Sequence, residues 1–250
     1  MDVLDIGLLI ASPFIGSFLA LLAYRLPEHE DIVFAPSKCR NCGHALAIRD
    51  LIPFVSYAFD GAKCRFCSGR ISATYPLVEL GALLVTVSAI WAANGWLTLA
   101  TCGFGWAMLV LFVTDVRTLK LPNAVTLPLI PIGLGVTYAF HGAYGELRDS
   151  VIGAIAGGAI LFGTAMAYRL LRGRTGLGMG DVKLFSAAGA WLGWQALPLV
   201  MLGACLIVLA GAIVFRIARR LALNGRTMLP LGAGLAPAIY VIWLVKALAA

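Results

Sequence analysis

Long apolar runs alternate with short polar connections along most of the chain. A helix of about 20 apolar residues spans the roughly 30 Å hydrocarbon core of a bilayer. The runs that we expect to cross it cover residues 4–24, 76–93, 97–116, 122–140, 150–171, 182–194, 196–217 and 229–248. The pattern therefore predicts an all-α polytopic membrane protein with about eight transmembrane helices, of which the run 182–194 is the shortest.

Composition supports this prediction. Hydrophobic residues make up 61% of the 250 residues and charged residues only 12%, about half the charged fraction of ordinary soluble domains. A secretory signal peptide would begin with basic residues, whereas Asp2 and Asp5 stand at the start of the first run. We therefore expect a retained first helix, with a cleaved signal peptide as the alternative.

Residues 25–75 differ from the rest of the chain. They contain seven of the 19 lysines and arginines, five of the 12 acidic residues and four of the six cysteines, and they contain no apolar run. The sequence thus predicts a first transmembrane helix at 1–24, a small soluble insert at 25–75 and a seven-helix membrane domain at 76–250.

The positions of the basic residues predict the orientation in the membrane. If all eight runs cross, Arg148 and Lys246 lie on one side and the other 17 of the 19 basic residues lie on the side of the insert. Such a bias marks the cytoplasmic side, so both termini should face the periplasm. Because the basic edge is an ordinary topology signal, no nucleic-acid binding is predicted from it.

Four cysteines form two C-x-x-C pairs within the insert, "CRNC" and "CRFC". They are Cys39, Cys42, Cys64 and Cys67. Two such pairs supply the four thiolates of a tetrahedral zinc site, and a cytoplasmic location keeps thiols reduced, which argues against the alternative of two disulfides. A site saturated by four thiolates has no open position, so we expect zinc to stabilise the small insert.

Three carboxylates lie in or at the ends of the later apolar runs, where ionisable groups are costly and suggest function. Asp115 ends the third run and Asp181 begins the sixth, so both should lie at the cytoplasmic edge; Glu79 is the third. Two neighbouring carboxylates share one proton, and such a pair can activate water and protonate a leaving amine. Gly178 and Gly180 would let an extended peptide approach Asp181.

Each of these acids also has a purely structural interpretation. Asp181 could cap the N-terminus of the sixth helix. Asp115 could form an ion pair with Arg117 or Lys120 at the membrane edge. Glu79 could be a buried hydrogen-bond acceptor.

Several motifs together resemble one known family. These are "GMGDVKL" around Asp181, which includes Lys183, the "LPN" that follows Asp115, and the two C-x-x-C pairs. Similar stretches occur at residues 16–27, 49–57, 71–80 and 178–194, in the same order along the chain. The chain therefore resembles the type IV prepilin peptidases, a bacterial group of G-x-G-D intramembrane aspartyl proteases.

The resemblance implies an activity and a location. Asp115 and Asp181 match the two catalytic positions, with Gly178, Gly180 and Lys183 as supporting motif residues. A member of this family in the bacterial inner membrane would cut the basic leader from type IV prepilins and from pseudopilins of type II secretion at the cytoplasmic face. Many members with four cysteines also methylate the new N-terminus, with S-adenosylmethionine as donor.

The chain departs from the family pattern before the third cysteine. Many members have a Gly-Lys or Gly-Arg pair that is linked to methyl transfer, whereas this chain has Ala62-Lys63. Lys63, together with Glu79 in the "YPLVEL" stretch, is the candidate for a role in methyl transfer.

A basic leader must also approach a basic membrane edge. We expect acidic residues of the insert to receive it; these are Glu28, Glu30, Asp31, Asp50 and Asp60.

Two other functions compete with the peptidase. An ion- or proton-coupled transporter also uses membrane carboxylates, but it should place them near the bilayer midplane rather than at one edge. A zinc-stabilised scaffold of a secretion apparatus would tolerate replacement of both aspartates by asparagine.

Overall fold

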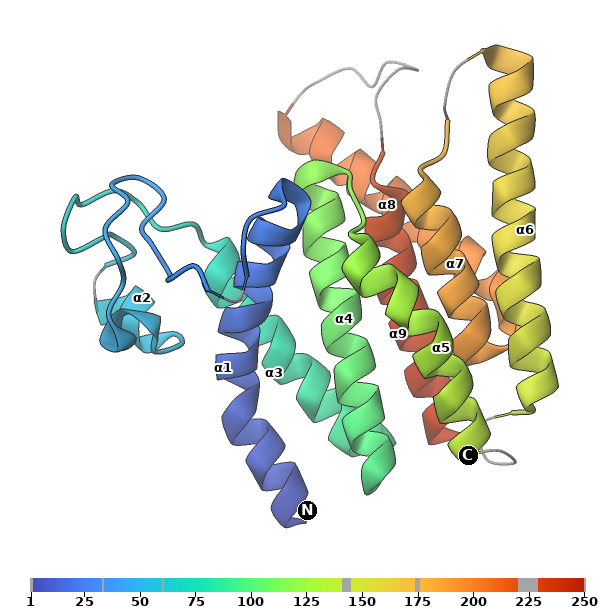
Figure 1. The fold of residues 1–250 in the computed structure, drawn as a ribbon, viewed down its shortest axis with the longest axis horizontal. Coiled ribbons are helices and arrows are strands. Elements are labelled where there is room, and N and C mark those ends of the chain that lie inside the picture. Colours follow the sequence, from blue (N-terminus) through green and yellow to red (C-terminus); the bar gives the residue numbers. More distant parts are fainter. Residues whose placement is uncertain are drawn as a thin grey trace. The chain divides into compact units, whose positions relative to one another are not determined.

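A computed structural model describes residues 2–32, 34–59, 61–140, 145–173, 176–219 and 229–249, and this part of the chain is helical without a named strand. The α-helices are α1 (Val3–Arg25), α2 (Val55–Phe59), α3 (Thr74–Ala92), α4 (Trp96–Thr118), α5 (Asn123–Ala139), α6 (Leu147–Arg172), α7 (Met179–Leu192), α8 (Leu197–Arg219) and α9 (Leu231–Leu248) (Figure 1). The predicted all-α fold class is confirmed.

Each of the eight apolar runs corresponds to one of these helices. Among the described residues, six helices are long and apolar enough to cross a membrane, namely α1, α3, α4, α6, α8 and α9. The apolar helix α5 has 17 residues and α7 has 14, so both are shorter than a usual span. The protein is therefore a membrane protein with several transmembrane helices, while the number eight stays a prediction.

The chain divides into two compact units, Met1–Val110 and Leu111–Ala250. The first unit contains α1, α3 and the four clustered cysteines, and the second contains Asp115 and Asp181 together with α5 to α9. Each candidate site thus lies within one unit. The division into a first helix, an insert and a seven-helix domain stays a prediction.

Helix α7 lies at the centre of the second unit, where it packs against α5, α6 and α9. Most side chains from Val182 to Leu192 are buried. Trp191 donates a hydrogen bond from Nε1 to the carbonyl of Leu129 at 2.8 Å and meets Trp243 edge to face, with ring centroids 5.1 Å apart. Neighbouring helices therefore cover most of α7.

Glycines set the distance between α6 and α7, which lie side by side in Figure 1. A Cβ on Gly153 would lie 2.6 Å from the carbonyl oxygen of Gly189, and one on Gly157 would lie 2.8 Å from that of Phe185. The hydroxyl of Ser186 donates to the carbonyl of Ala154 at 2.8 Å across the same interface. Small residues therefore bring the two backbones into contact, as is usual for membrane helices.

Polar side chains fix the C-terminal end of α7. Asp149 accepts hydrogen bonds from Nε1 of Trp194 at 3.2 Å and from Nε2 of Gln195 at 2.7 Å. The ammonium of Lys246 donates to the carbonyl of Leu192 at 3.0 Å, a favourable place for a cation at a helix C-terminus. Since this end is held, the position of Asp181 at the other end of α7 is defined.

We expect Gly153→Ala to destabilise the second unit by about 1–3 kcal/mol, because its methyl group would overlap the backbone of α7. Gly163→Ala in the same helix is the matched control, since no atom lies within 4 Å of a Cβ there. It should be neutral or stabilising, because alanine favours helix more than glycine. Thermal unfolding in detergent measures the difference, and equal melting temperatures for the two variants would contradict this packing.

Candidate active site and metal centre

Asp115 lies near the C-terminal end of α4 and is only 5% exposed. Its Oδ2 accepts the backbone N–H of Ala233 at 2.7 Å, and the N–H of Gly232 also donates to this carboxylate. Both donors belong to the first turn of α9, whose N-cap residue, Pro230, offers no side-chain hydrogen bond. Asp115 therefore caps a helix that begins more than 100 residues later in the sequence.

Asp181 lies in the first turn of α7, after the N-cap residue Gly178. It is therefore not the N-cap, although its carboxylate accepts a hydrogen bond from the backbone of Gly178. Burial, followed by the nearby charge of Asp115, raises the pKa of Asp181 to about 6, while the hydrogen bond from Gly178 lowers it. The structure thus brings the two predicted aspartates close enough for their charges to interact.

Leu121 packs against the beginnings of both α7 and α9. A Cβ on Gly180 would lie 2.7 Å from Cβ of Leu121, and one on Gly232 would lie 2.9 Å from Cδ1 of the same leucine. A Cβ on Gly178 would lie 3.0 Å from Oδ2 of Asp181. Packing against Leu121 therefore favours glycine at position 180, and a side chain at position 178 would press on the carboxylate of Asp181.

A hydrogen bond joins the two sequence motifs that contain the aspartates. Nζ of Lys183, two residues after Asp181, donates to Oδ1 of Asn123 at 2.7 Å. Asn123 is the last residue of "LPN" and the first of α5. The N-terminal ends of α5, α7 and α9 and the C-terminal end of α4 thus gather at one end of the second unit (Figure 1). The sequence analysis did not single out Gly232 and Ala233, and it included Leu121 and Asn123 only as part of the "LPN" motif.

Two carboxylates whose charges interact do not both ionise easily, so such a pair can hold one proton. An ionised carboxylate can take a proton from water, and a protonated one can give its proton to a leaving group. Asp115 is buried and Asp181 is partly buried. Water screens charges less at such positions, so the interaction between the two carboxylates is stronger than it would be in bulk water.

The four cysteines of the insert form one cluster. Their sulfur atoms all lie within 4.8 Å of one another, and Sγ of Cys39 lies 3.9 Å from Sγ of Cys67. Four sulfurs at about 2.3 Å from a tetrahedral zinc ion would be about 3.8 Å apart, so the cluster fits a metal ion. All four cysteines are free, as the ligands of a metal ion are.

The two C-x-x-C pairs adopt the same backbone turn. The N–H of Cys39 donates to the carbonyl of His44, and the N–H of Cys64 donates to that of Gly69, both at 2.9 Å. The rings of His44 and Phe66 pack together with centroids 3.5 Å apart, one from each turn. The repeated turn presents two sulfurs from each pair to a common centre.

The two candidates for methyl transfer have different surroundings. Lys63 is exposed on the second cysteine turn, and Ala62 before it has φ of +60°, a conformation that favours glycine. Glu79 is 5% exposed and accepts the N–H of Phe54 at 2.9 Å. The interpretation of Glu79 as a buried hydrogen-bond acceptor is thus confirmed, and the structure places Lys63 in a different environment.

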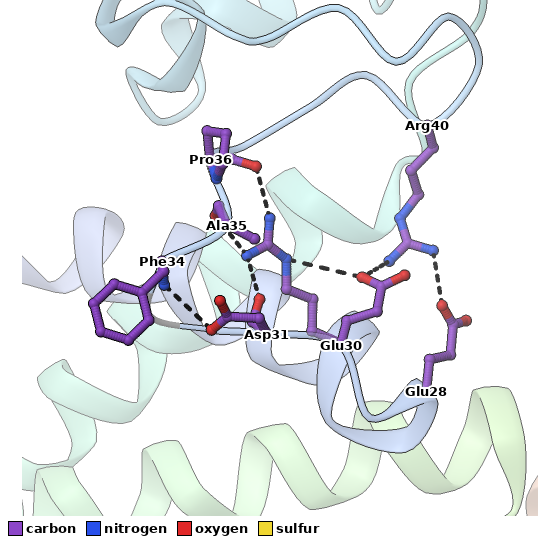
Figure 2. Close-up of polar contacts among 8 residues, drawn as sticks. Glu28, Glu30, Asp31, Phe34, Ala35, Pro36 and Arg40 are labelled. Carbon is purple, nitrogen blue, oxygen red and sulfur yellow. Dashed lines mark hydrogen bonds and ion pairs between the residues drawn. The ribbon is translucent and has the colours of Figure 1, made fainter.

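Arg25, the last residue of α1, holds the beginning of the insert by its guanidinium group. It donates to three backbone carbonyls, those of Asp31 at 2.8 Å, Ala35 at 2.9 Å and Pro36 at 2.9 Å (Figure 2). The side chain is only 9% exposed, so these carbonyls replace the water that the charge loses on burial.

Most acids that we expected to receive a basic leader already have partners within the insert. Arg40 lies 3.6 Å from Glu28 and 3.9 Å from Glu30 (Figure 2). Asp50 pairs with Arg65 at 3.2 Å. Asp31 accepts the N–H of Phe34 at 3.2 Å, and Asp60 lies outside the described residues. The insert therefore presents less free negative charge than the sequence suggests.

Comparison with known proteins gives matches over most of the chain. Residues 10–93 match the bacterial peptidase A24 N-terminal domain, and residues 102–215 match the type IV leader peptidase family. No solved structure gives a significant match.

Several curated relatives carry the name prepilin leader peptidase/N-methyltransferase. One from Aeromonas salmonicida (strain A449) is 38% identical over 222 residues, which cover 78% of this chain and 76% of the relative. One from Pseudomonas putida is 34% identical over 255 residues, with 92% and 87% covered. One from Burkholderia pseudomallei (strain K96243) is 42% identical over 191 residues, with 76% and 60% covered.

The hydrogen bond between Lys183 and Asn123 can be tested by a double-mutant cycle. We expect Lys183→Met and Asn123→Ala each to lower stability by about 1 kcal/mol, the usual contribution of one hydrogen bond. The double variant should lose no more than either single variant, because both remove the same interaction. Thermal unfolding of the four proteins gives the coupling, and strictly additive losses would show that the two side chains do not stabilise each other.

Proposed function

The chain belongs to the prepilin leader peptidase/N-methyltransferase family, and we propose that it removes the basic leader of type IV prepilins and pseudopilins and then methylates the new N-terminus. The observation that carries the peptidase part is the pair Asp115 and Asp181. The two aspartates come from separate helices, and each carboxylate accepts a hydrogen bond from the N-terminal end of a helix. They are close enough for the charge of Asp115 to act on Asp181.

The proposed cleavage needs no covalent intermediate. One carboxylate accepts a proton from a water molecule. The oxygen of that water adds to the carbonyl carbon of the scissile bond. The other carboxyl group gives its proton to the leaving nitrogen as the C–N bond breaks. A peptide must be extended to be cut, and Gly178 adds no side chain beside Asp181, whereas Leu121 fills the space next to Gly180.

We infer the orientation in the membrane from the charges. The positive-inside bias favours an inner-membrane protein with both aspartates and the insert on the cytoplasmic side and both termini in the periplasm. A basic leader that stays in the cytoplasm is then presented at the edge where Asp115 and Asp181 lie. A transporter would need ionisable groups deeper in the membrane, and these two lie at one end of their helices.

We propose that the four cysteines hold zinc as a structural ion. Cys39, Cys42, Cys64 and Cys67 would supply all four ligands and leave no position for substrate or water. The ion would fix two turns of an insert that has few helices of its own.

Methyl transfer with S-adenosylmethionine as donor is proposed from the family alone. Glu79 is already bonded to the backbone of Phe54, and Lys63 is exposed elsewhere on the insert. Both residues stay candidates, and no step of methyl transfer is assigned to them.

We expect both Asp115→Asn and Asp181→Asn to abolish leader removal while the proteins keep their melting temperatures within a few degrees. Each change removes a group that must take or give a proton and preserves shape. Glu146→Gln is the matched control, because this exposed N-cap residue of α6 makes no side-chain cap hydrogen bond and the variant should keep cleavage. Purified protein would be incubated with a prepilin and S-adenosylmethionine, and the products read by intact mass. A scaffold would show no cleavage in wild type and no loss of secretion in the variants.

The zinc proposal predicts one zinc ion per chain in protein purified without added metal, as measured by inductively coupled plasma mass spectrometry. Cys64→Ser should lose the ion and make residues 25–75 sensitive to a protease, because the two turns lose their link. Cys205→Ser is the matched control, since this exposed cysteine lies in α8, and it should retain one zinc. Wild-type protein that is folded and contains no zinc, or contains iron instead, would contradict the assignment.

A further inference from the structure

The two aspartates of the pair differ in what holds them. Asp115 receives two backbone N–H groups from the first turn of α9, those of Gly232 and Ala233. Asp181 receives one, from Gly178 at the start of its own helix. An N–H donor stabilises an ionised carboxylate more than a protonated one, and two donors do so more than one.

The beginning of α9 is also the positive end of an 18-residue helix dipole. Pro230, the N-cap residue, leaves the first turn without a side-chain acceptor, so Asp115 supplies the negative group that this turn lacks. A Cβ on Gly232 would lie 3.0 Å from both Cγ and Oδ2 of Asp115. A glycine at this position therefore allows the carboxylate to reach the helix end.

The charge on Asp115 acts in turn on Asp181. A second carboxylate beside a fixed negative charge favours its protonated form. Burial and this charge together raise the pKa of Asp181 to about 6. Lys183 is the nearest cation along α7, and its ammonium is bonded to Asn123.

We propose that the N-terminus of α9 is part of the active site, where Gly232 and Ala233 hold Asp115 as the ionised residue that activates water, so that Asp181 carries the proton for the leaving amine. This assignment rests on the proposed peptidase function and adds to it which aspartate has which role. Gly232 and Ala233 are positioning residues, because they act through Asp115 and do not touch the substrate.

The proposed step balances in atoms and charge. The water oxygen bonds to the carbonyl carbon while one water proton moves to the Asp115 carboxylate. The C–N bond then breaks as the proton of Asp181 moves to the nitrogen, which releases an amine and a carboxylic acid. Asp115 now holds a proton and Asp181 a charge, and one proton passed from Asp115 to Asp181 restores the starting state.

Infrared spectroscopy of protein with ¹³C-labelled aspartate carboxyl groups tests the assignment directly. Wild type should show a protonated-carboxyl band that titrates at a pH of about 6. The band with this midpoint should be lost in Asp181→Asn. It should remain in Asp115→Asn with a lower midpoint, because the neighbouring charge is gone. A wild type without the band, or an Asp181→Asn variant whose band keeps the wild-type midpoint, would overturn the proposal.

Kinetics test the role of α9 separately. Ala233→Pro removes the N–H that bonds to Asp115, at a helix position where proline is tolerated. We expect kcat to fall about ten- to a hundredfold with KM little changed, as for the loss of one charge-assisted hydrogen bond in the reaction step. Leu231→Pro adds proline two residues earlier, at the first position of α9, without removing a donor to Asp115, and it should keep most of the kcat.

The two proposals fail in different ways. If wild type does not cleave any of several prepilins, the peptidase function is wrong whatever the infrared band shows. If wild type cleaves while the infrared band is lost in Asp115→Asn instead of Asp181→Asn, only the assignment of roles is wrong. The same holds if wild type cleaves while Ala233→Pro retains its kcat.

Discussion

Buried charge is the constraint on which this structure depends. The chain is mostly apolar, and a charge removed from water must find fixed donors or acceptors inside the protein. Backbone groups provide them at four places: carbonyls surround Arg25, one N–H meets Glu79, two meet Asp115, and the carbonyl of Leu192 accepts from Lys246. Among the described residues, no buried side-chain nitrogen or oxygen lacks a hydrogen-bond partner.

Satisfying these charges also connects distant parts of the sequence. Asp115 joins the end of α4 to the beginning of α9, and Lys246 joins α9 to the end of α7. Helix α7 is therefore held at its far end by side chains and along its length by small residues that admit α6. Its first turn, with Asp181, is presented beside Asp115 as a consequence of packing throughout the second unit.

Much of this arrangement could be predicted from residue patterns. Each predicted apolar run corresponds to a helix in the described part of the chain, and C-x-x-C spacing indicated the cysteine cluster, because both follow from local periodicity and turn geometry. The common depth of Asp115 and Asp181 suggested that they meet. Backbone donors could not be predicted, since nothing in the sequence says that the turn at Gly232 and Ala233 lies against Asp115. The ion pairs of Arg40 with Glu28 and Glu30 could not be predicted either, because the sequence does not show that these side chains lie close together.

Glycine-rich starts to α7 and α9 were the available signal for the missed contacts. Both "GMGD" and "LGAG" begin helices with residues that have little side chain. In each case the structure shows a leucine or a carboxylate in the space that a larger side chain would fill. Sequence alone shows the small residues and leaves open which group they accommodate.

The most direct test of the central claim is a cross-linking measurement at the two aspartate positions. Asp115→Cys and Asp181→Cys would be combined in one chain and treated with a short reagent that links two thiols, and the linked peptides would be identified by mass spectrometry. A link between positions 115 and 181 is the predicted result. Asp115→Cys combined with Gln195→Cys should give none, because α7 alone is about 21 Å long. Equal linking of both pairs, or none between 115 and 181, would contradict a single site made by the two aspartates.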